Sequence, residues 1–144
     1  MLIKMNINDC LKKRILRKIV PDLEKSKSSI NIAVSKLDEA QKLFQSEFWN
    51  NAFLSAYTSI FHSARALLYH DGIQEKSHYA VFVYLKEKYS NLIPSSLINS
   101  FYEYQKQRHK ILYGLEEMNS KEDSGEIIDD AEEFLNKIME ILNL

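Results

Sequence analysis

Apolar side chains recur every three or four residues along most of the chain, which is the spacing of one face of an α-helix. Residues that cap or break helices divide this pattern into segments. The segments predict helices over residues 9–20, 21–46, 48–69, 77–89, 95–113 and 126–142. Four of them are long, so the pattern predicts an all-α fold, an up-and-down helical bundle of four long helices plus shorter additions.

The residues that favour turns support this division. Three glycines and two prolines are too few for the many turns of a β-sandwich, a barrel or a multi-stranded α/β sheet. All five fall at predicted helix ends: Pro21, Gly72, Pro94, Gly114 and Gly125. Gly72 is expected to end its helix in the left-handed conformation.

These segments predict one domain over residues 1–144. Residues 1–20 are expected to contain a basic N-terminal helix. Residues 73–76 are expected to form a short loop, and the polar residues 117–125 a mobile loop. Apolar residues make up 45% of the chain, which is enough for a hydrophobic core and argues against disorder over the whole chain.

Composition also limits the class of protein. No apolar run approaches the ~20 residues of a membrane-spanning helix, and the N-terminus lacks the pattern of a secretory signal. The single cysteine excludes an intrachain disulfide, and no thiol or imidazole groups have metal-ligand spacing. We therefore expect a cytoplasmic protein with no membrane segment, no metal and no cofactor.

Charge is balanced over the chain but not along it. The formal net charge is −1, yet residues 1–27 carry eight basic and three acidic groups, and residues 116–144 carry ten acidic and two basic groups. The basic end is suited to nucleic-acid phosphates or an acidic partner. Alternatively, the two ends are neighbouring helices whose charges complement each other.

One arginine lies on an apolar helix face. Steps of three or four residues along the fifth predicted helix pass through Leu97, Phe101, Tyr104, Arg108, Ile111 and Leu115. An unpaired guanidinium costs several kcal/mol to desolvate. Arg108 is therefore expected to pair with a buried carboxylate, to face a partner subunit or to line a cleft that binds phosphate. Snorkelling, in which the stem packs and the head reaches water, is the structural alternative.

The third predicted helix carries a core stripe and, beside it, a smaller and more polar face. Ser55, Ser59, His62 and Tyr69 lie on the polar face, where small residues permit a close helix approach and hydroxyl groups can bond across an interface. Arg65 lies between the two faces, and we interpret it as a partner in a structural salt bridge.

These residues carry a resemblance to a known family. Its three parts are residues 52–68 (AFLSAYTSIFHSARALL), residues 76–78 (KSH) and residues 108–114 (RHKILYG). In this order they resemble the HEPN domain (higher eukaryotes and prokaryotes nucleotide-binding), and in particular its small stand-alone prokaryotic members. The resemblance covers about residues 25–142 and implies a helical bundle that forms a homodimer.

The resemblance also implies a function. Many such proteins are paired with a minimal nucleotidyltransferase in toxin–antitoxin systems, and active members are metal-independent endoribonucleases. Their motif is Arg, a polar residue, three or more further residues and then His. Arg108 matches the Arg and His109 the polar position, whereas Tyr113 stands where the final His is expected. Tyrosine, with a pKa near ~10, is a poor general base at neutral pH.

Two hypotheses follow for the function. In the first, the protein belongs to a nucleotidyltransferase-linked system and binds RNA or a nucleotide, or cleaves RNA, with Arg108, His109 and Tyr113 as candidate catalytic residues. In the second, it is a non-catalytic helical module for dimerisation or protein interaction. The candidates for the dimer interface or cleft are His62, Arg65, Tyr69, His78 and Tyr104.

Overall fold

A computed structural model describes residues 5–114 and 120–144. Four long helices dominate it: α2 (Leu23–Gln45), α3 (Trp49–Asp71), α5 (Ser95–Leu112) and α6 (Lys121–Ile141). The shorter elements are α1 (Ile7–Lys12), β1 (Leu16–Lys18), β2 (Ile73–Glu75) and α4 (His78–Lys88). The predicted all-α class is confirmed, with one small antiparallel ribbon of β1 and β2 added to it.

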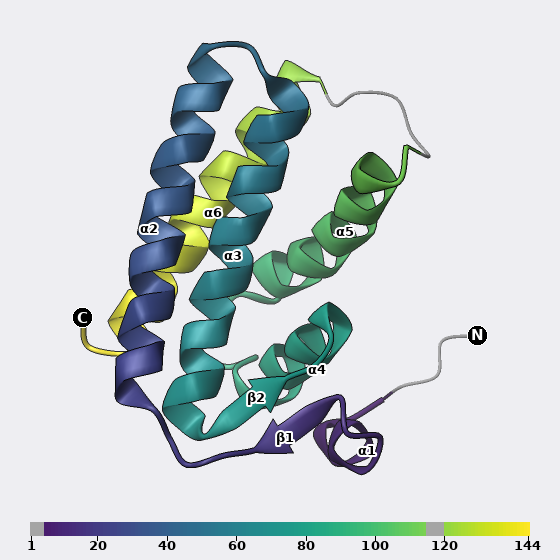
Figure 1. The fold of residues 1–144 in the computed structure, drawn as a ribbon, viewed down its shortest axis with the longest axis vertical. Coiled ribbons are helices and arrows are strands. Elements are labelled where there is room, and N and C mark those ends of the chain that lie inside the picture. The colour runs from purple at the N-terminus through teal and green to yellow at the C-terminus, as the bar shows by residue number, and fades with distance from the viewer. Residues whose placement is uncertain (1–4, 115–119) are drawn as a thin grey trace.

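The long helices surround α3 (Figure 1). Helices α2 and α3 lie side by side as a hairpin, α6 packs against both, and α5 and α4 lie along the other side of α3. The ribbon and α1 close one end of the bundle. No helix in the two described ranges combines the length and the apolar character needed to cross a membrane.

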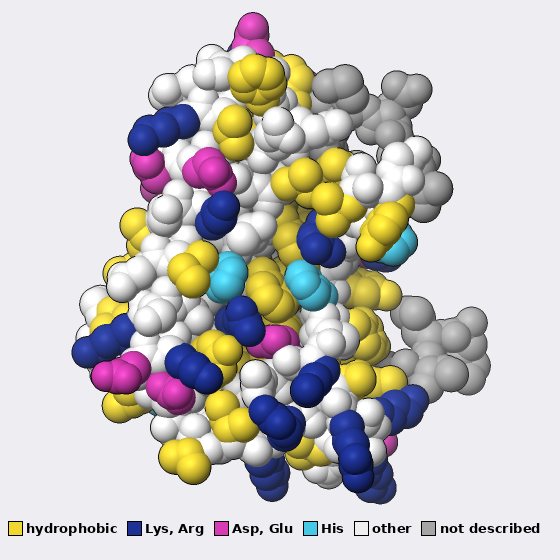
Figure 2. Space-filling view, in the orientation of Figure 1, with side chains coloured by type: hydrophobic (Ala, Val, Ile, Leu, Met, Phe, Trp, Pro, Cys, Tyr) yellow, Lys and Arg dark blue, Asp and Glu magenta, His cyan; other side chains and the backbone are white. Residues whose placement is uncertain are grey.

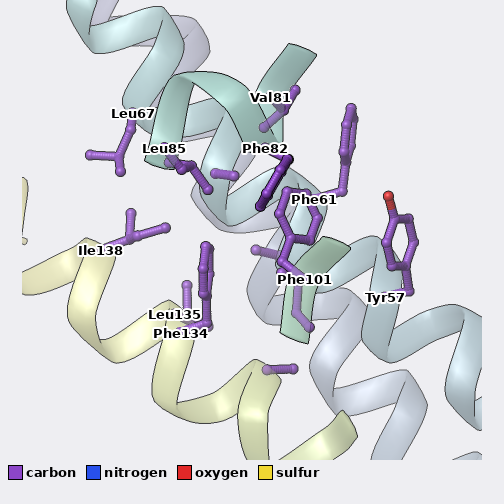
Figure 3. Close-up of a cluster of buried hydrophobic side chains, with 14 of the residues drawn as sticks. Tyr57, Phe61, Leu67, Val81, Phe82, Leu85, Phe101, Phe134, Leu135 and Ile138 are labelled. Atoms are coloured by element: carbon purple, nitrogen blue, oxygen red, sulfur yellow. The ribbon is translucent and has the colours of Figure 1, made fainter. Parts of the chain in front are cut away.

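An aromatic cluster joins the bundle where α3, α5 and α6 meet (Figure 3). The ring of Tyr57 stacks on that of Phe101 with centroids 5.9 Å apart, and Phe101 lies 6.1 Å from Phe134. All three side chains are buried. Because aromatic rings bury large apolar areas and pair in specific geometries, this cluster sets how α5 and α6 sit on α3.

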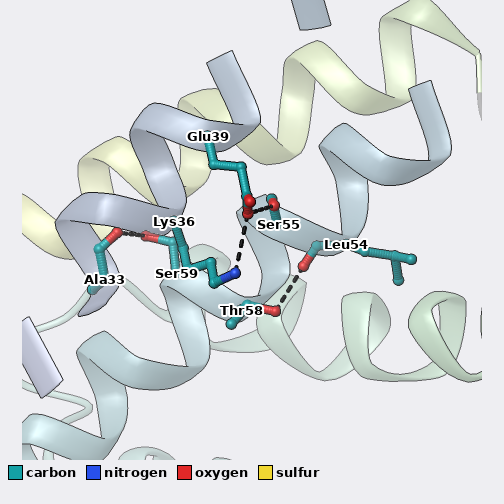
Figure 4. A network of polar contacts seen from close by, with 7 residues as sticks. All are labelled: Ala33, Lys36, Glu39, Leu54, Ser55, Thr58 and Ser59. Atoms are coloured by element: carbon teal, nitrogen blue, oxygen red, sulfur yellow. Dashed lines mark hydrogen bonds and ion pairs between the residues drawn. The ribbon is translucent and has the colours of Figure 1, made fainter. Parts of the chain in front are cut away.

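Small and hydroxyl-bearing residues bring α2 close to α3 (Figure 4). The Ser59 hydroxyl donates to the carbonyl of Ala33 at 2.7 Å, and the Ser55 hydroxyl donates to Glu39. Glu39 also accepts from Lys36 at 3.1 Å. The polar face predicted on α3 therefore does bond across an interface, and that interface is with α2 of the same chain.

The N-terminal region differs from its prediction. The expected helix over residues 9–20 is wrong, because α1 ends at Lys12 and Arg14 takes a left-handed conformation with φ of 60°. The chain then reverses into β1, which pairs with β2 in the segment predicted as a loop. The strand has only three residues and no alternating pattern, so pairing with a segment far along the chain selects it.

The start of the last helix also differs from its prediction. Residues 121–125 of the expected mobile loop are helical, and residues 115–119 lie outside the described residues. Ser120 caps α6 in a capping box with Asp123, since each side chain accepts from the other's backbone N–H. Gly125 lies within α6, where an added Cβ would be 3.5 Å from Phe44. That distance is an ordinary van der Waals contact, and Gly125 lies inside a helix and not at a helix end.

Some predicted core positions and one charge interpretation also change. The apolar spacing of the helix predicted over residues 21–46 places Leu23 and Val34 in its core stripe, but these side chains are 60% and 48% exposed. Helix α1 packs on α4 and β1, whereas the acidic α6 packs on α3 and α2 (Figure 1). The basic segment before α2 and the acidic end of the chain thus belong to different parts of the molecule and do not form a complementary helix pair.

Gly72 holds the end of α3 against the segment that follows β1. Its φ is 78°, its carbonyl accepts from the Ile19 N–H at 2.9 Å, and an added Cβ would lie 2.7 Å from the Ile19 carbonyl oxygen. We expect Gly72→Ala to lower the free energy of unfolding by about 1–3 kcal/mol, measured by urea denaturation.

Gly114→Ala is the matched control. Gly114 also has a positive φ, 66°, but a Cβ there would meet no atom of the described residues within 4 Å. It should cost only the conformational penalty of about 1 kcal/mol. Equal losses in the two variants would contradict the role assigned to the close approach at Gly72.

Candidate functional site

The side chain of Arg108 lies on α5 over a ring of α3. Its Cζ is 5.5 Å from the centroid of the Tyr57 ring, and its side chain is partly buried. Among the described residues, no carboxylate forms an ion pair with it. One role expected for Arg108 is to pair with a buried carboxylate. Within residues 5–114 and 120–144 the structure shows no such pair. Contact of the head group with water, a partner subunit or a bound anion is left to complement its charge.

His78 links Tyr57 to the start of α4. The phenol of Tyr57 and Nδ1 of His78 share a hydrogen bond of 2.7 Å, and the imidazole stacks on the Phe61 ring at 4.1 Å. Ser77 caps α4 by accepting from the Ala80 N–H. In addition, the Gln105 amide of α5 donates to the His78 carbonyl at 2.8 Å. Three helices therefore fix the imidazole.

Arg65 lies one turn beyond Phe61 on α3. Its Nε donates to Glu75 of β2 at 2.7 Å, which confirms the expected structural salt bridge. Its Cζ is also 5.8 Å from the Phe61 ring and 5.4 Å from the Tyr69 ring. Arg65 thus connects the ribbon to the aromatic surface of α3.

The electrostatics of these residues are positive. Burial, together with the nearby charges of Arg108 and Arg65, lowers the pKa of His78 to about 4. Burial, Arg65 and Lys36 likewise lower the pKa of His62. The buried Nδ1 of His62 has no hydrogen-bond partner among the described atoms. Both imidazoles are neutral at pH 7, and an anion placed here would meet cations.

We name this group of residues the Arg108 cluster. Figure 2 shows Lys, Arg and His side chains around apolar ones in the middle of the face that includes α3. Two carboxylates of the described residues bond to the cluster or beside it: Glu75 pairs with Arg65, and Glu39 pairs with Lys36 and accepts from Ser55. The cluster consists of Lys36, Tyr57, Phe61, His62, Arg65, His78 and Arg108.

Comparison with known proteins places the chain in a family. The family model described as HEPN domain matches residues 26–142. The chain belongs to the HEPN domain family. A protein of Methanocaldococcus jannaschii named "Putative toxin MJ0605" is 31% identical over 124 residues, which span 83% of this chain and 90% of that protein. The resemblance carried by residues 52–68, 76–78 and 108–114 is therefore confirmed at the level of the family.

The other residues of the HEPN motif lie at the C-terminal end of α5. The rings of His109 and Tyr113 are 4.5 Å apart, His109 is exposed, and Tyr113 is 65% exposed. Neither ring contacts Tyr57 or His78 within the described part of the chain. The motif residues thus lie in two places. The guanidinium of Arg108 is partly buried, whereas the rings of His109 and Tyr113 are exposed.

The candidates for the cleft divide in the same way. His62, Arg65 and His78 come together in the cluster, and Tyr69 is buried beneath Arg65 with the Lys25 ammonium 5.7 Å from its ring. Tyr104 lies elsewhere. It donates to Asp130 of α6 at 2.5 Å and packs edge-on against Phe53, so it belongs to the α5–α6 interface.

Sequence reasoning left several members of the cluster unassigned. It placed Tyr57 in the core stripe of α3 and gave no role to Phe61, Lys36 or Glu75. A signal was present, because Tyr57, Phe61 and Arg65 are spaced four residues apart and therefore form one row along a helix. No group of His, Cys, Asp and Glu in the described residues is arranged to hold a metal ion.

The cluster predicts how the pKa of His78 responds to its neighbours. Since the positive charge of Arg108 disfavours a second cation beside it, Arg108→Gln should raise the pKa of His78 above about 4. An NMR titration of the imidazole resonances measures this shift. Lys106→Gln is the matched control, because Lys106 lies on the same helix with its ammonium 4.7 Å from the Tyr102 ring. An unchanged His78 pKa in Arg108→Gln would refute the coupling.

Proposed function

We propose that this HEPN protein is the toxin-like member of a toxin–antitoxin pair with a minimal nucleotidyltransferase, and that as a homodimer it binds RNA at the Arg108 cluster. Membership of the HEPN family supports the proposal. So does the name of the Methanocaldococcus jannaschii relative, because the match covers most of both chains. Because this chain is similar to that protein over most of its length, we assign it the same type of role, that of a toxin.

The observation that carries RNA binding is the Arg108 guanidinium, which has no carboxylate partner among the described residues. A guanidinium presents a planar fork of donors that matches phosphate oxygens. Arg65 is held nearby by Glu75, and Lys36 lies within electrostatic reach of His62. A phosphate at Arg108 would therefore gain charge-assisted hydrogen bonds in a partly desolvated position.

In this proposal, cleavage requires a general base close to the bound phosphate. Arg108 holds the scissile phosphate, and His109 is the residue suited to take the proton of the ribose 2′-hydroxyl. The 2′-oxygen then bonds to phosphorus, the bond from phosphorus to the 5′-oxygen breaks, and the same proton passes from His109 to the departing 5′-oxygen. Tyr113 lies against His109 and can orient it. Neither step uses a metal ion, because phosphate binding and proton transfer are both assigned to side chains.

One observation favours the alternative, a non-catalytic dimerisation module. Tyr113 stands at the position of the motif His, and it is strongly exposed beside Leu112, which is 48% exposed. Tyrosine is enriched at protein interfaces, and exposed apolar neighbours suit such a surface. In this alternative the end of α5 is a contact surface, and Arg108 faces the partner subunit.

The test compares wild-type protein with Arg108→Ala and, as control, Lys106→Ala. Fluorescence anisotropy measures binding of a labelled RNA, and gels measure its cleavage in EDTA. Loss of charge-assisted hydrogen bonds worth about 1.5–3 kcal/mol should weaken RNA binding by about 10-fold to 100-fold in Arg108→Ala. The control should bind RNA as the wild type does.

The outcomes separate the alternatives. Cleavage that Arg108→Ala abolishes supports the endoribonuclease, and binding without cleavage supports an RNA-binding toxin component. RNA binding by a folded Arg108→Ala protein at wild-type affinity overturns the proposed site. A wild-type protein that binds no RNA, with a dimer that Arg108→Ala weakens in light scattering, supports the interaction module.

A further inference from the structure

A second cationic feature lies beside the β1–β2 ribbon. It is a pocket of about 510 Å³ with two leucines and four cations in its lining, and no carboxylate lines it. All four cationic residues are exposed. The lining residues are Leu11, Arg14, Leu16, Arg17, Lys18 and Lys76. We name this feature the ribbon pocket.

The chain reversal after α1 builds the ribbon pocket. The left-handed conformation of Arg14 turns the chain so that β1 runs back beside α1. The Lys76 N–H then donates to the Ile15 carbonyl at 2.8 Å, which brings Lys76 against β1. Cations from segments about 60 residues apart in sequence are thereby assembled around one hollow.

The acidic groups of the neighbouring elements are engaged elsewhere. Asp9 accepts from the Asn6 N–H in the cap of α1, and Glu87 accepts from the Ile7 N–H. Glu75 is paired with Arg65, and Asp71 accepts from two tyrosine hydroxyls of the α4 region.

None of the four pocket cations forms an ion pair with a described carboxylate. Arg17 instead donates to the neutral amide oxygen of Gln74. The ribbon pocket is therefore lined by four cations, and none of them is paired with a carboxylate of the described residues.

We propose that the ribbon pocket is a second phosphate-binding site, which takes backbone phosphates of the RNA strand whose binding the proposed function assigns to the Arg108 cluster. The inference rests on that function. A hollow ringed by two guanidinium and two ammonium groups suits a tetrahedral phosphate better than it suits a flat acidic surface. Figure 2 shows Lys and Arg side chains over the ribbon on the same face as the His-containing cluster.

The two sites are connected through β2. Glu75 pairs with Arg65 of the cluster, and the next residue, Lys76, lines the ribbon pocket. A strand that leaves Arg108 can therefore continue over Arg65 to the ribbon. Arg14, Arg17 and Lys18 precede residue 26, where the match to the HEPN family begins. Three of the four cations of the ribbon pocket thus lie outside the matched region, and Lys76 lies inside it.

The test neutralises the pocket with Lys18→Gln/Lys76→Gln and compares it with Lys42→Gln/Lys137→Gln, which removes the same charge from α2 and α6. RNA affinity is measured at several salt concentrations in full-length protein. Each phosphate contact with single-stranded RNA adds about 0.7 to the slope of log affinity against log salt. The pocket variant should lower that slope by about 0.7–1.4 and weaken binding by about tenfold at low salt.

A conservative variant guards against effects on folding. Lys18→Arg/Lys76→Arg keeps both charges and should retain wild-type affinity and salt slope. RNA length adds a second readout. The pocket variant should lose affinity for an RNA of about 20 nucleotides but bind a tetranucleotide as the wild type does, because a short strand occupies only one site.

The outcomes distinguish this inference from the function on which it rests. If Arg108→Ala loses RNA binding while the pocket variant keeps both affinity and slope, the ribbon pocket is overturned and the proposed function stands. If the pocket variant alone loses binding, the ribbon pocket stands and the site at Arg108 fails. If the pocket variant binds RNA normally but loses binding to polyglutamate, the partner is an acidic protein and the inference is overturned.

Discussion

The burial of α3 is the constraint on which the rest of the structure depends. Of its 23 residues, 14 are buried, and they face α2, α6, α5 and the ribbon in turn. A helix that is covered on nearly all sides needs small residues where backbones approach closely and large ones where gaps must be filled. Serine and alanine serve the side toward α2, and aromatic rings serve the side toward α5 and α6.

The chemistry of the Arg108 cluster follows from this burial. Tyr57 is 1% exposed, so desolvation raises the pKa of its phenol and keeps it neutral. Its hydroxyl still needs a hydrogen-bond partner, and His78 supplies one. Polar groups therefore lie at the edge of the core beside α3. There the guanidinium groups of Arg65 and Arg108 lie over the uncharged rings of Phe61, Tyr69 and Tyr57. Arg65 is paired with Glu75, and Arg108 has no carboxylate partner among the described residues. A cation held on such a rigid apolar base binds an anion at little further conformational cost.

Much of the fold could be predicted from the local pattern of residues. The parts that could not be predicted depend on contacts between distant segments. The left-handed end of α3 at Gly72 and the cap at Ser77 are set by their own residues. The start of α6 could have been found from the capping box of Ser120 and Asp123, but the polar composition around it resembles a loop. The β1–β2 pairing gives no local signal, because each strand has only three residues.

The candidate site shows the same division. Arg108 is conspicuous in the sequence because it interrupts an apolar stripe, and Arg65 and His62 follow from helical spacing on α3. The contact of His78 with Tyr57 depends on the direction in which α4 leaves the ribbon, which no spacing rule provides. Tyr104 lies on the same face of α5 as Arg108, one turn earlier. Its hydroxyl donates to Asp130 of α6, so it packs two helices together instead of joining the cluster. Tertiary packing decides between such roles.

The ribbon also sets an order of assembly. Arg17 and Gln74 are 57 residues apart, and the segment between them contains the whole α2–α3 hairpin. Closing so long a loop from an unfolded chain carries a large entropic cost for a ribbon of only three pairs. Once the hairpin has formed, its two open ends already lie together, and little of that cost is left. We therefore expect the N-terminal segment to dock late in folding, when Cys10 and Leu16 complete the hydrophobic core.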